Sequence, residues 1–222
     1  MAKTIVQARN RRSPHPRNSA ETRAAILRAA ERIFAEAGLE GARTDAIAAA
    51  ATVNKAMLYY YFKSKDGLYR AVLEANAVEF HRRAMEVLAG PGSPRDVLLR
   101  YVSNHFDFIG ARPYYSRLYQ RLIMTGDRSL DRLIKLHWIP IYRRLAKLVE
   151  KGVQAGEVRP VDVRHTVVSL VALTVFYFNA APIVRKISGV DAFAKMEQAR
   201  RKKEVLDFIR HALFTDPEAV VQ

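Results

Sequence analysis

The sequence predicts an all-α protein with about nine helices. Apolar residues recur at helical spacing along nearly the whole chain, and no Asn-Gly or Asp-Gly turn separates two alternating apolar runs, as it would in a β-hairpin. Of the 222 residues, 50% are hydrophobic and 27% are charged, which is typical of a folded chain with a sizeable core.

The first 18 residues differ from the rest of the chain. They contain five basic residues and no acidic residue, together with two prolines and almost no periodicity. This composition predicts a disordered basic arm over residues 1–18. The segment also lacks the apolar core of a secretory signal, so we expect a cytoplasmic protein.

The first helix is expected over residues 20–37. Ile26 and Phe34 lie on its apolar stripe, Ser19 can cap its start, and Gly38 follows its end, where a positive φ is usual.

Two short helices are expected next, over residues 44–51 and 54–62. Thr44 and Asn54 can each accept a hydrogen bond from the first turn of the helix that they begin, and Ser64 can do the same for the following helix. Two short helices with a turn of about three residues between them fit a helix–turn–helix.

A fourth helix is expected over residues 65–88, followed by a Gly- and Pro-rich connection at residues 90–94. Longer helices are expected after it, over 94–109, 113–124, 130–151, 161–178 and 193–214. The uncharged stretch 165–184 is about long enough to span a bilayer, but its polar residues favour a buried helix in a core or a subunit interface.

The second short helix presents a small, aromatic and cationic face. Lys55, Tyr59 and Lys63 share this face, and the three consecutive tyrosines at 59–61 cannot all be buried because successive helical residues point about 100° apart. Such a face offers donors to phosphates and apolar contacts to thymine methyl groups. A contact between helices without any role in DNA binding is the alternative.

The residues around this segment also match a known family. The matching positions are Ile26-Leu27-x-Ala29-Ala30-x-x-Ile33-Phe34-x-x-x-Gly38, Thr44-x-x-Ile47-Ala48 and Val53-Asn54-Lys55-x-x-Leu58-Tyr59-x-Tyr61-Phe62-x-Ser64-Lys65-x-x-Leu68. Over about residues 22–72 the chain resembles the DNA-binding domain of the TetR/AcrR family.

The resemblance implies a three-helix helix–turn–helix DNA-binding domain over residues 19–66. It also implies a helical ligand-binding and dimerisation domain over residues 67–222. Such a protein would be a homodimeric repressor that binds a palindromic double-stranded DNA operator and is released by a small-molecule effector. An activator of the same fold stays open.

Positions carried over from the family, with Met57 added from the outward face of the helix, give the expected DNA contacts. These are Thr44, Asn54, Lys55, Ala56, Met57, Tyr59, Tyr60, Tyr61 and Lys65. Two positions depart from the family's usual residues: Thr52 stands where glycine is frequent, and Tyr61 stands where histidine is frequent. A β-branched residue is poor at a positive φ, so the turn either avoids that conformation or carries strain. The basic arm could also enter the neighbouring minor groove.

Aromatic residues cluster in the second domain, which predicts an apolar pocket with a few polar groups. The expected lining residues are Tyr101, His105, Tyr115, Tyr119, Trp138 and Tyr142. Core packing is the alternative for each of them. Arg112, Arg117 and Arg121 lie close together in the sequence and could bind an anionic ligand, although a solvated face is the favoured interpretation.

The last two predicted helices carry broad apolar faces that suit pairing across a two-fold axis. The expected dimerisation residues are Val168, Val171, Ala172, Val175, Val205, Phe208, Ile209 and Ala212. This pairing would also explain the uncharged stretch without membrane insertion.

The composition excludes several other classes of function. Without cysteine there is no disulfide, zinc–thiolate site or cysteine nucleophile, and no glycine-rich phosphate loop, zinc-protease motif or nucleophile elbow is present. We therefore expect no enzyme, no metal and no cofactor. The net charge of +15 favours polyanionic partners, so a non-specific architectural or membrane-surface protein remains the third hypothesis.

Overall fold

The computed structural model describes residues 19–217, and the predicted arm at 1–18 lies outside them. Most of the described residues are helical, and none of them forms a named strand, which confirms the all-α class. The elements are α1 (Ser19–Gly41), α2 (Thr44–Ala51), α3 (Lys55–Phe62), α4 (Lys65–Leu88), α5 (Pro94–Gly110), α6 (Pro113–Thr125), α7 (Ser129–Leu133), a π-helical turn (Ile134–Trp138), α8 (Ile139–Gln154), α9 (Val163–Asn179), α10 (Ala181–Ser188) and α11 (Lys195–Leu213).

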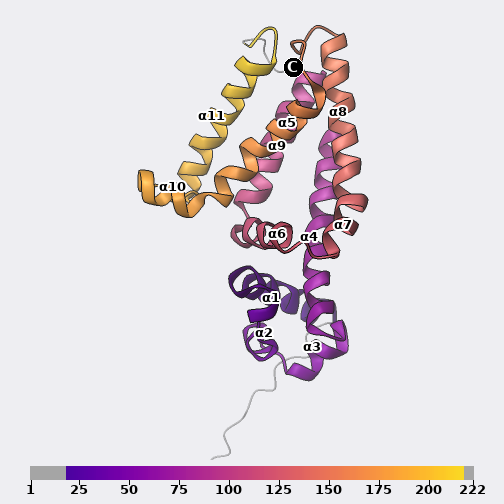
Figure 1. The fold of residues 1–222 in the computed structure, drawn as a ribbon, viewed down its shortest axis with the longest axis vertical. Coiled ribbons are helices and arrows are strands. Elements are labelled where there is room, and N and C mark those ends of the chain that lie inside the picture. The colour runs from indigo at the N-terminus through magenta and orange to yellow at the C-terminus, as the bar shows by residue number, and fades with distance from the viewer. Residues whose placement is uncertain (1–18, 218–222) are drawn as a thin grey trace, which may run out of the picture.

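Two helical bundles share the helix α4 (Figure 1). The small bundle holds α1, α2 and α3, and the larger one holds α5 to α11, with α6 lying across the junction beside α1. Since α4 runs without interruption from Lys65, the predicted boundary between residues 66 and 67 falls inside its first turn.

The small bundle is held by a compact apolar core. Ile26, Ile47, Leu58 and Leu68 come from its four helices and are completely buried. Phe34 is buried with them, so each helix contributes at least one large side chain to the centre. Burying such a side chain contributes about 1.5–3 kcal/mol, which fixes α3 on the other three helices.

Of the predicted helix caps, those at Asn54 and Ser64 are confirmed. Asn54 Oδ1 accepts a hydrogen bond from Met57 N at 2.8 Å, and Ser64 Oγ accepts one from Gly67 N at 2.9 Å, as predicted. The predicted cap at Thr44 is wrong, because Arg43 holds the extended cap position and makes no side-chain capping bond. Thr44 is instead the first helical residue, one position too late to cap.

The turn between α2 and α3 adopts a left-handed conformation. Thr52 has φ 57° and ψ 46°, and its N–H bonds to Ala49 O at 3.1 Å. The turn therefore carries the strain that its β-branched residue causes at positive φ. Gly38 also has the expected positive φ, of 73°, but α1 continues beyond it to Gly41.

The predicted helix at 130–151 is not continuous. A π-helical turn separates α7 from α8, and Ile139 N bonds to Ile134 O, five residues earlier. Pro140 explains the break, because it has no N–H for an i→i−4 bond and its ring would clash with the carbonyl of Leu136.

The sequence interpretation also missed α10. Pro182 lies in the first turn of this helix, where proline's missing N–H costs nothing, so it starts a new helix after α9 ends at Asn179. The final helix, predicted over 193–214, is α11.

Candidate functional site

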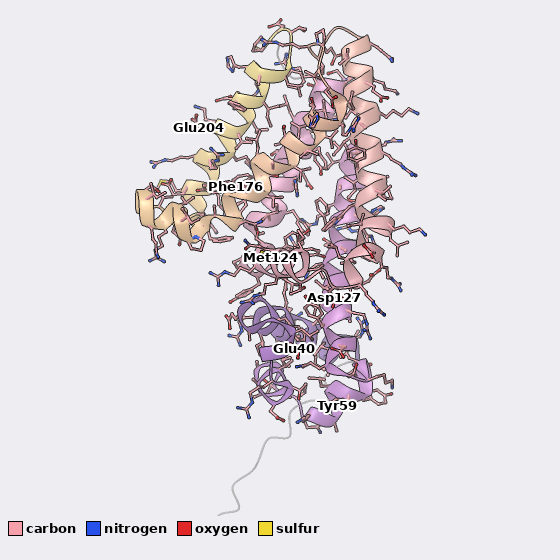
Figure 2. The ribbon with its side chains drawn as sticks, viewed as in Figure 1. Glu40, Tyr59, Met124, Asp127, Phe176 and Glu204 are labelled. Carbon is pink, nitrogen blue, oxygen red and sulfur yellow. The ribbon has the colours of Figure 1, made fainter. Side chains whose placement is uncertain are left out.

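The exposed end of α3 forms a surface at the tip of the small bundle. Tyr59 and Tyr60 have 40% and 72% of their side chains exposed, and Figure 2 labels Tyr59 at this tip. Asn54, Lys55 and Ala56 precede them and are exposed too, and Met57 is half-buried. The structure thus brings the expected donors, apolar groups and aromatic rings onto the free end of one short helix.

The cations near α3 have partners within the protein. Lys55 Nζ lies 3.0 Å from Asp45 Oδ1 on α2, and both side chains are well exposed, so the ion pair is weak. Lys65 Nζ donates to Glu40 O at 3.2 Å. Lys63 Nζ donates to Tyr60 O at 3.0 Å and lies 5.6 Å from the centre of the Tyr60 ring. These contacts hold the ammonium groups near α3 at little cost to their exposure.

Tyr61 lies apart from the other two tyrosines. It is half-buried, and its hydroxyl donates to Ser19 Oγ on α1 at 3.1 Å. In this structure the side chain connects α3 to α1, and its expected phosphate contact stays a prediction. Tyr60 and Tyr59 point about 100° and 200° away from Tyr61 around the helix, and both are exposed.

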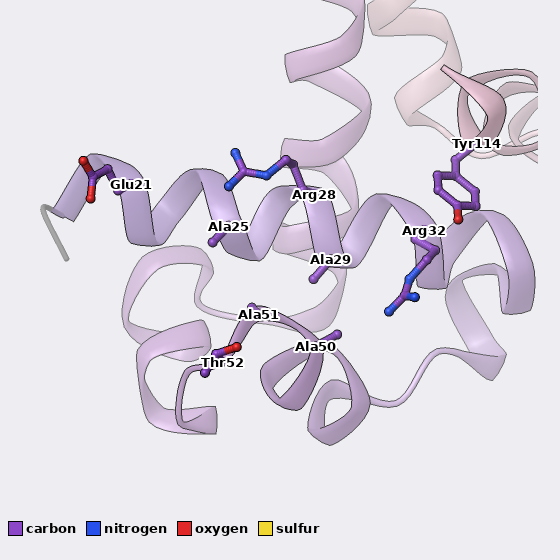
Figure 3. Close-up of a pocket in the computed structure, with 9 residues that line it drawn as sticks. All are labelled: Glu21, Ala25, Arg28, Ala29, Arg32, Ala50, Ala51, Thr52 and Tyr114. Carbon is purple, nitrogen blue, oxygen red and sulfur yellow. The ribbon is translucent and has the colours of Figure 1, made fainter. Parts of the chain in front are cut away.

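A groove of about 530 Å³ lies between α1 and the end of α2 (Figure 3). Arg28 and Arg32 line it from α1, Thr52 from the turn and Tyr114 from α6. The sequence interpretation did not single out these arginines, although their i,i+4 spacing places them on one helix face. In Figure 3 their guanidinium groups point in different directions, so they do not converge on one ligand.

A second cavity, of about 420 Å³, lies inside the larger bundle. Its walls come from α4, α5, α6, the π-helical turn, α8 and α9. All six residues predicted to line a pocket lie around it: Tyr101, His105, Tyr115, Tyr119, Trp138 and Tyr142. Its size is typical of small-molecule sites.

Aromatic contacts connect these walls. The His105 ring lies 5.7 Å from Tyr101 and 4.9 Å from Phe80, measured between ring centres. Tyr119 lies 4.4 Å from Tyr115 and 5.8 Å from Trp138. Rings at these spacings stabilise one another beyond their simple burial, so the cavity has a rigid aromatic lining.

His105 is the central polar group of this lining. Its Nδ1 lies 2.9 Å from Thr174 Oγ1, and the residue is only 3% exposed. Burial lowers the pKa of His105 from 6.5 to about 4, so the imidazole is neutral at pH 7. Burial also raises the pKa values of Tyr101 and Tyr115 above their usual range, so both hydroxyls keep their protons.

Other polar groups around the cavity differ in their partners. Tyr119 Oη donates its one hydrogen to Leu73 O on α4, at 2.8 Å. Among the described residues, Ser116 Oγ and Asn179 Oδ1 are buried without any hydrogen-bond partner. Such unpaired buried groups are costly, and each gains when a ligand supplies the missing partner.

The three arginines considered for an anionic ligand do not line this cavity. Arg112 lies 4.0 Å above the centre of the Phe108 ring and donates to Phe108 O. Arg117 is exposed, and Arg121 faces α1. Only Arg117 fits the solvated face that was favoured, since Arg112 and Arg121 make contacts within the protein. None of the three supports an anionic ligand in this cavity.

Arg121 links the cavity helix to the small bundle. Its Nε donates to Ala35 O at 3.1 Å and its Nη2 to Glu36 O at 2.9 Å, just before Gly38 breaks the geometry of α1. The guanidinium satisfies carbonyls that have lost their helical partners and adds positive charge where the helix dipole favours it. Since α6 also lines the cavity through Tyr119 and its neighbours, both bundles meet at this residue.

Comparisons with known proteins agree with this arrangement. Residues 26–72 match the N-terminal domain model of bacterial regulatory proteins of the tetR family, and residues 74–216 match the model of the C-terminal region of YcdC-like proteins. The chain belongs to the TetR family. This is a family of DNA-binding transcriptional regulators rather than enzymes, so the expected resemblance is confirmed.

Individual relatives of this TetR-family regulator are distant. The transcriptional regulator RutR of Escherichia coli K12 is 28% identical over 74% of this chain and 77% of its own length. The repressor NicS of Pseudomonas putida is 26% identical over 80% of this chain and 85% of its own. A regulator from Saccharomonospora viridis, solved in complex with choline, is 20% identical, with a TM-score of 0.70 over 88% of this chain and 98% of its own.

The expected dimer face of the TetR-family regulator needs correction. Val205 and Ile209 are each only 2% exposed, because α11 buries them in the core of its own chain. Phe208 and Ala212 face outward, and Phe176, on the neighbouring helix α9, is 69% exposed. The four other residues predicted for the interface border the cavity: Val168, Val171, Ala172 and Val175. Val168, at 59%, and Ala172 are also exposed, so their place in an interface stays a prediction.

The uncharged stretch belongs to two helices of the regulator. In the described part of the chain, no single helix combines the length and apolar character of a membrane span. α9 and α10 have this length and apolar character only when they are taken together, and the pair is bent by 67° at their junction.

Proposed function

We propose that this regulator is a cytoplasmic homodimeric repressor. It binds a palindromic operator through α2 and α3, and it leaves the operator when a small molecule fills the aromatic cavity.

The unbroken helix α4 is the observation that carries this proposal. It begins just after α3, and it contributes Phe80 to the cavity wall. With 24 residues and a rise of 1.5 Å per residue it is about 36 Å long, so a tilt of 5° at one end moves the other by about 3 Å. A ligand that favours one tilt thereby shifts the population of DNA-binding conformations.

The tip of α3 supplies the DNA contacts in this proposal. Asn54, Lys55, Ala56 and Met57 would lie near base edges in the major groove, and Tyr59 and Tyr60 would donate to phosphates. Thr44 and Lys65 lie half-buried at the first turns of α2 and α4 and would contact the backbone, and so would Tyr61, whose hydroxyl bonds to α1 in this structure.

The exposed aromatic residues of α9 and α11 support the homodimer. Phe176 and Phe208 are 69% and 60% exposed, although large apolar side chains on a monomer's surface normally gather at interaction sites. Pairing across a two-fold axis would bury both copies of each ring. It would also set two recognition helices to read half-sites about 34 Å apart.

The test begins with an operator selected by the full-length protein from random double-stranded DNA. We expect Lys55→Ala to weaken binding and to reduce the slope of log K against log[salt] by about two, because the homodimer loses two cations from its DNA-facing surface. Lys203→Ala is the matched control, since Lys203 is an exposed lysine on α11, in the other bundle. Equal affinities of Lys55→Ala and Lys203→Ala, or failure to select any sequence, would contradict the proposal.

Transcription distinguishes repression from activation. With the selected operator cloned upstream of a reporter gene, the repressor lowers expression, and its deletion restores it. Higher expression in the presence of the protein would instead establish the activator alternative.

A further inference from the structure

We propose that the cavity takes an uncharged, largely aromatic or aliphatic molecule that donates a hydrogen bond to Nε2 of His105, a hydroxyl or N–H compound rather than an ion. The inference rests on the proposed ligand-responsive function and names the ligand class of that same cavity.

The residues that line the cavity offer no opposite charge to a charged ligand. None of the described residues that surround the cavity is Asp, Glu, Lys or Arg. The imidazole of His105 is neutral at pH 7 because burial lowers its pKa to about 4. An ion of either sign in this cavity would lose its hydration shell without gaining an opposite charge, which is unfavourable. For a cation, the faces of the aromatic rings would be the one compensation, and the choline probe tests it.

Thr174 determines which nitrogen of His105 carries the proton. Its oxygen lies 2.8 Å from Val171 O and 2.9 Å from His105 Nδ1, and its hydroxyl has one hydrogen. Both contacts are hydrogen bonds only when the hydroxyl donates to Val171 O and accepts from Nδ1, so we assign the imidazole proton to Nδ1. In a neutral imidazole the other nitrogen, Nε2, is then an acceptor only.

His105 Nε2 has no hydrogen-bond donor within the described protein, so a ligand would have to supply one. No described residue makes a hydrogen bond to His105 Nε2, although the side chain lines the cavity. Asn179 Oδ1, at the same cavity, is buried and has no hydrogen-bond partner. A site with unpaired acceptors discriminates strongly against a ligand of the same shape that has no donor.

Trp138 provides the measurement. It is the single tryptophan of the chain, and it lines the cavity, so its fluorescence reports occupancy directly. The probes are 4-propylphenol, its methyl ether 4-propylanisole, which has nearly the same shape without a donor, 4-propylbenzoate and choline, titrated into the full-length protein.

We expect 4-propylphenol to bind at least tenfold more tightly than 4-propylanisole, and 4-propylbenzoate and choline to bind less tightly than either. Equal binding of the phenol and the ether would overturn the role of His105. Tighter binding of the benzoate or of choline, or the absence of a response to all four probes, would overturn the ligand class.

Two variants locate the discrimination. Thr174→Val frees the imidazole to change tautomer, and His105→Phe removes it, so both should lower the phenol-to-ether affinity ratio toward one while the ether still binds. Thr166→Val is the matched control on α9, because Thr166 bonds only to Asp162 O and does not line the cavity. A ratio unchanged in Thr174→Val would refute the tautomer argument.

The four probes are compared in the unaltered protein, so the phenol-to-ether ratio still tests the inference if a buried substitution prevents folding. The titrations also contain no DNA. A failure of this inference is therefore seen in the probe ratio, and a failure of the proposed function is seen in operator binding.

Discussion

Replacing Thr52 by glycine should stabilise this regulator. Thr52 holds φ 57° and ψ 46°, a left-handed conformation that costs a residue with a β-carbon about 1–2 kcal/mol. Glycine removes this cost but gives the unfolded chain more freedom, which offsets about 0.5–1 kcal/mol. The Thr52 side chain is exposed and its N–H remains bonded to α2, so little else changes.

The net expectation is a gain of about 0.5–1 kcal/mol in the free energy of unfolding, or about 1–4 °C in Tm for a chain of this size. Urea unfolding and thermal melting of Thr52→Gly measure it. Ala50→Gly is the matched control, since Ala50 is an exposed helical residue of α2 and glycine there costs about 1 kcal/mol. If Thr52→Gly loses as much stability as Ala50→Gly, the strain argument is refuted.

Three further outcomes are expected. A Cβ on Gly67 would lie 2.2 Å from Phe62 O, so Gly67→Ala should cost about 1–3 kcal/mol in urea unfolding, whereas Gly41→Ala, with its nearest neighbour at 3.4 Å, should not destabilise. Arg121→Met removes two hydrogen bonds to the end of α1 and should cost about 1–2 kcal/mol in the same assay; no loss would show that the link is unimportant. The pKa of His105 in the folded protein, about 4, lies below its unfolded value of 6.5. Its contribution to the free energy of unfolding is therefore complete above pH 6.5 and falls by up to about 1.4 kcal/mol per pH unit toward pH 4. If His105→Gln leaves the slope of stability against pH unchanged, this expectation is contradicted.

The small bundle was largely predictable because its signals are local. Asn54 and Ser64 cap helices through bonds that span three residues, and Leu58 and Phe62 share a helix face by spacing alone. The failure at Thr44 is also local, since a capping residue displaced by one position loses its function. The π-helical turn could have been placed from Pro140, which no α-helical interior accommodates without a cost.

The larger bundle was less predictable because α9 is apolar on nearly all sides. Val168 and Val175 line the cavity, Val167 lies in the core and Phe176 is exposed, yet their side chains differ little in hydropathy. The stripe through Val205 on α11 correctly indicated a buried face. A stripe cannot tell whether the covering surface belongs to the same chain or to a second copy.

The cluster of aromatic residues indicated the walls of a cavity, which periodicity alone did not. Tyr101 and Tyr115 come from different helices and both lie around it, as expected of a site lined mostly by aromatic side chains. Their partners were beyond prediction, because the bond between His105 and Thr174 joins residues 69 positions apart.

The π-helical turn has a consequence for the phase of the helix that follows it. Such a turn takes up one residue more than an α-helical turn, and each α-helical residue advances by about 100°. All side chains of α8 are therefore rotated by about that angle relative to a continuation of α7. His137 bonds to Glu74 on α4 at 3.2 Å, while Trp138 and Tyr142 line the cavity. Deleting a single residue from this turn would rotate the two segments back into register and carry one of these sets of side chains away from its neighbours, with almost no change in composition.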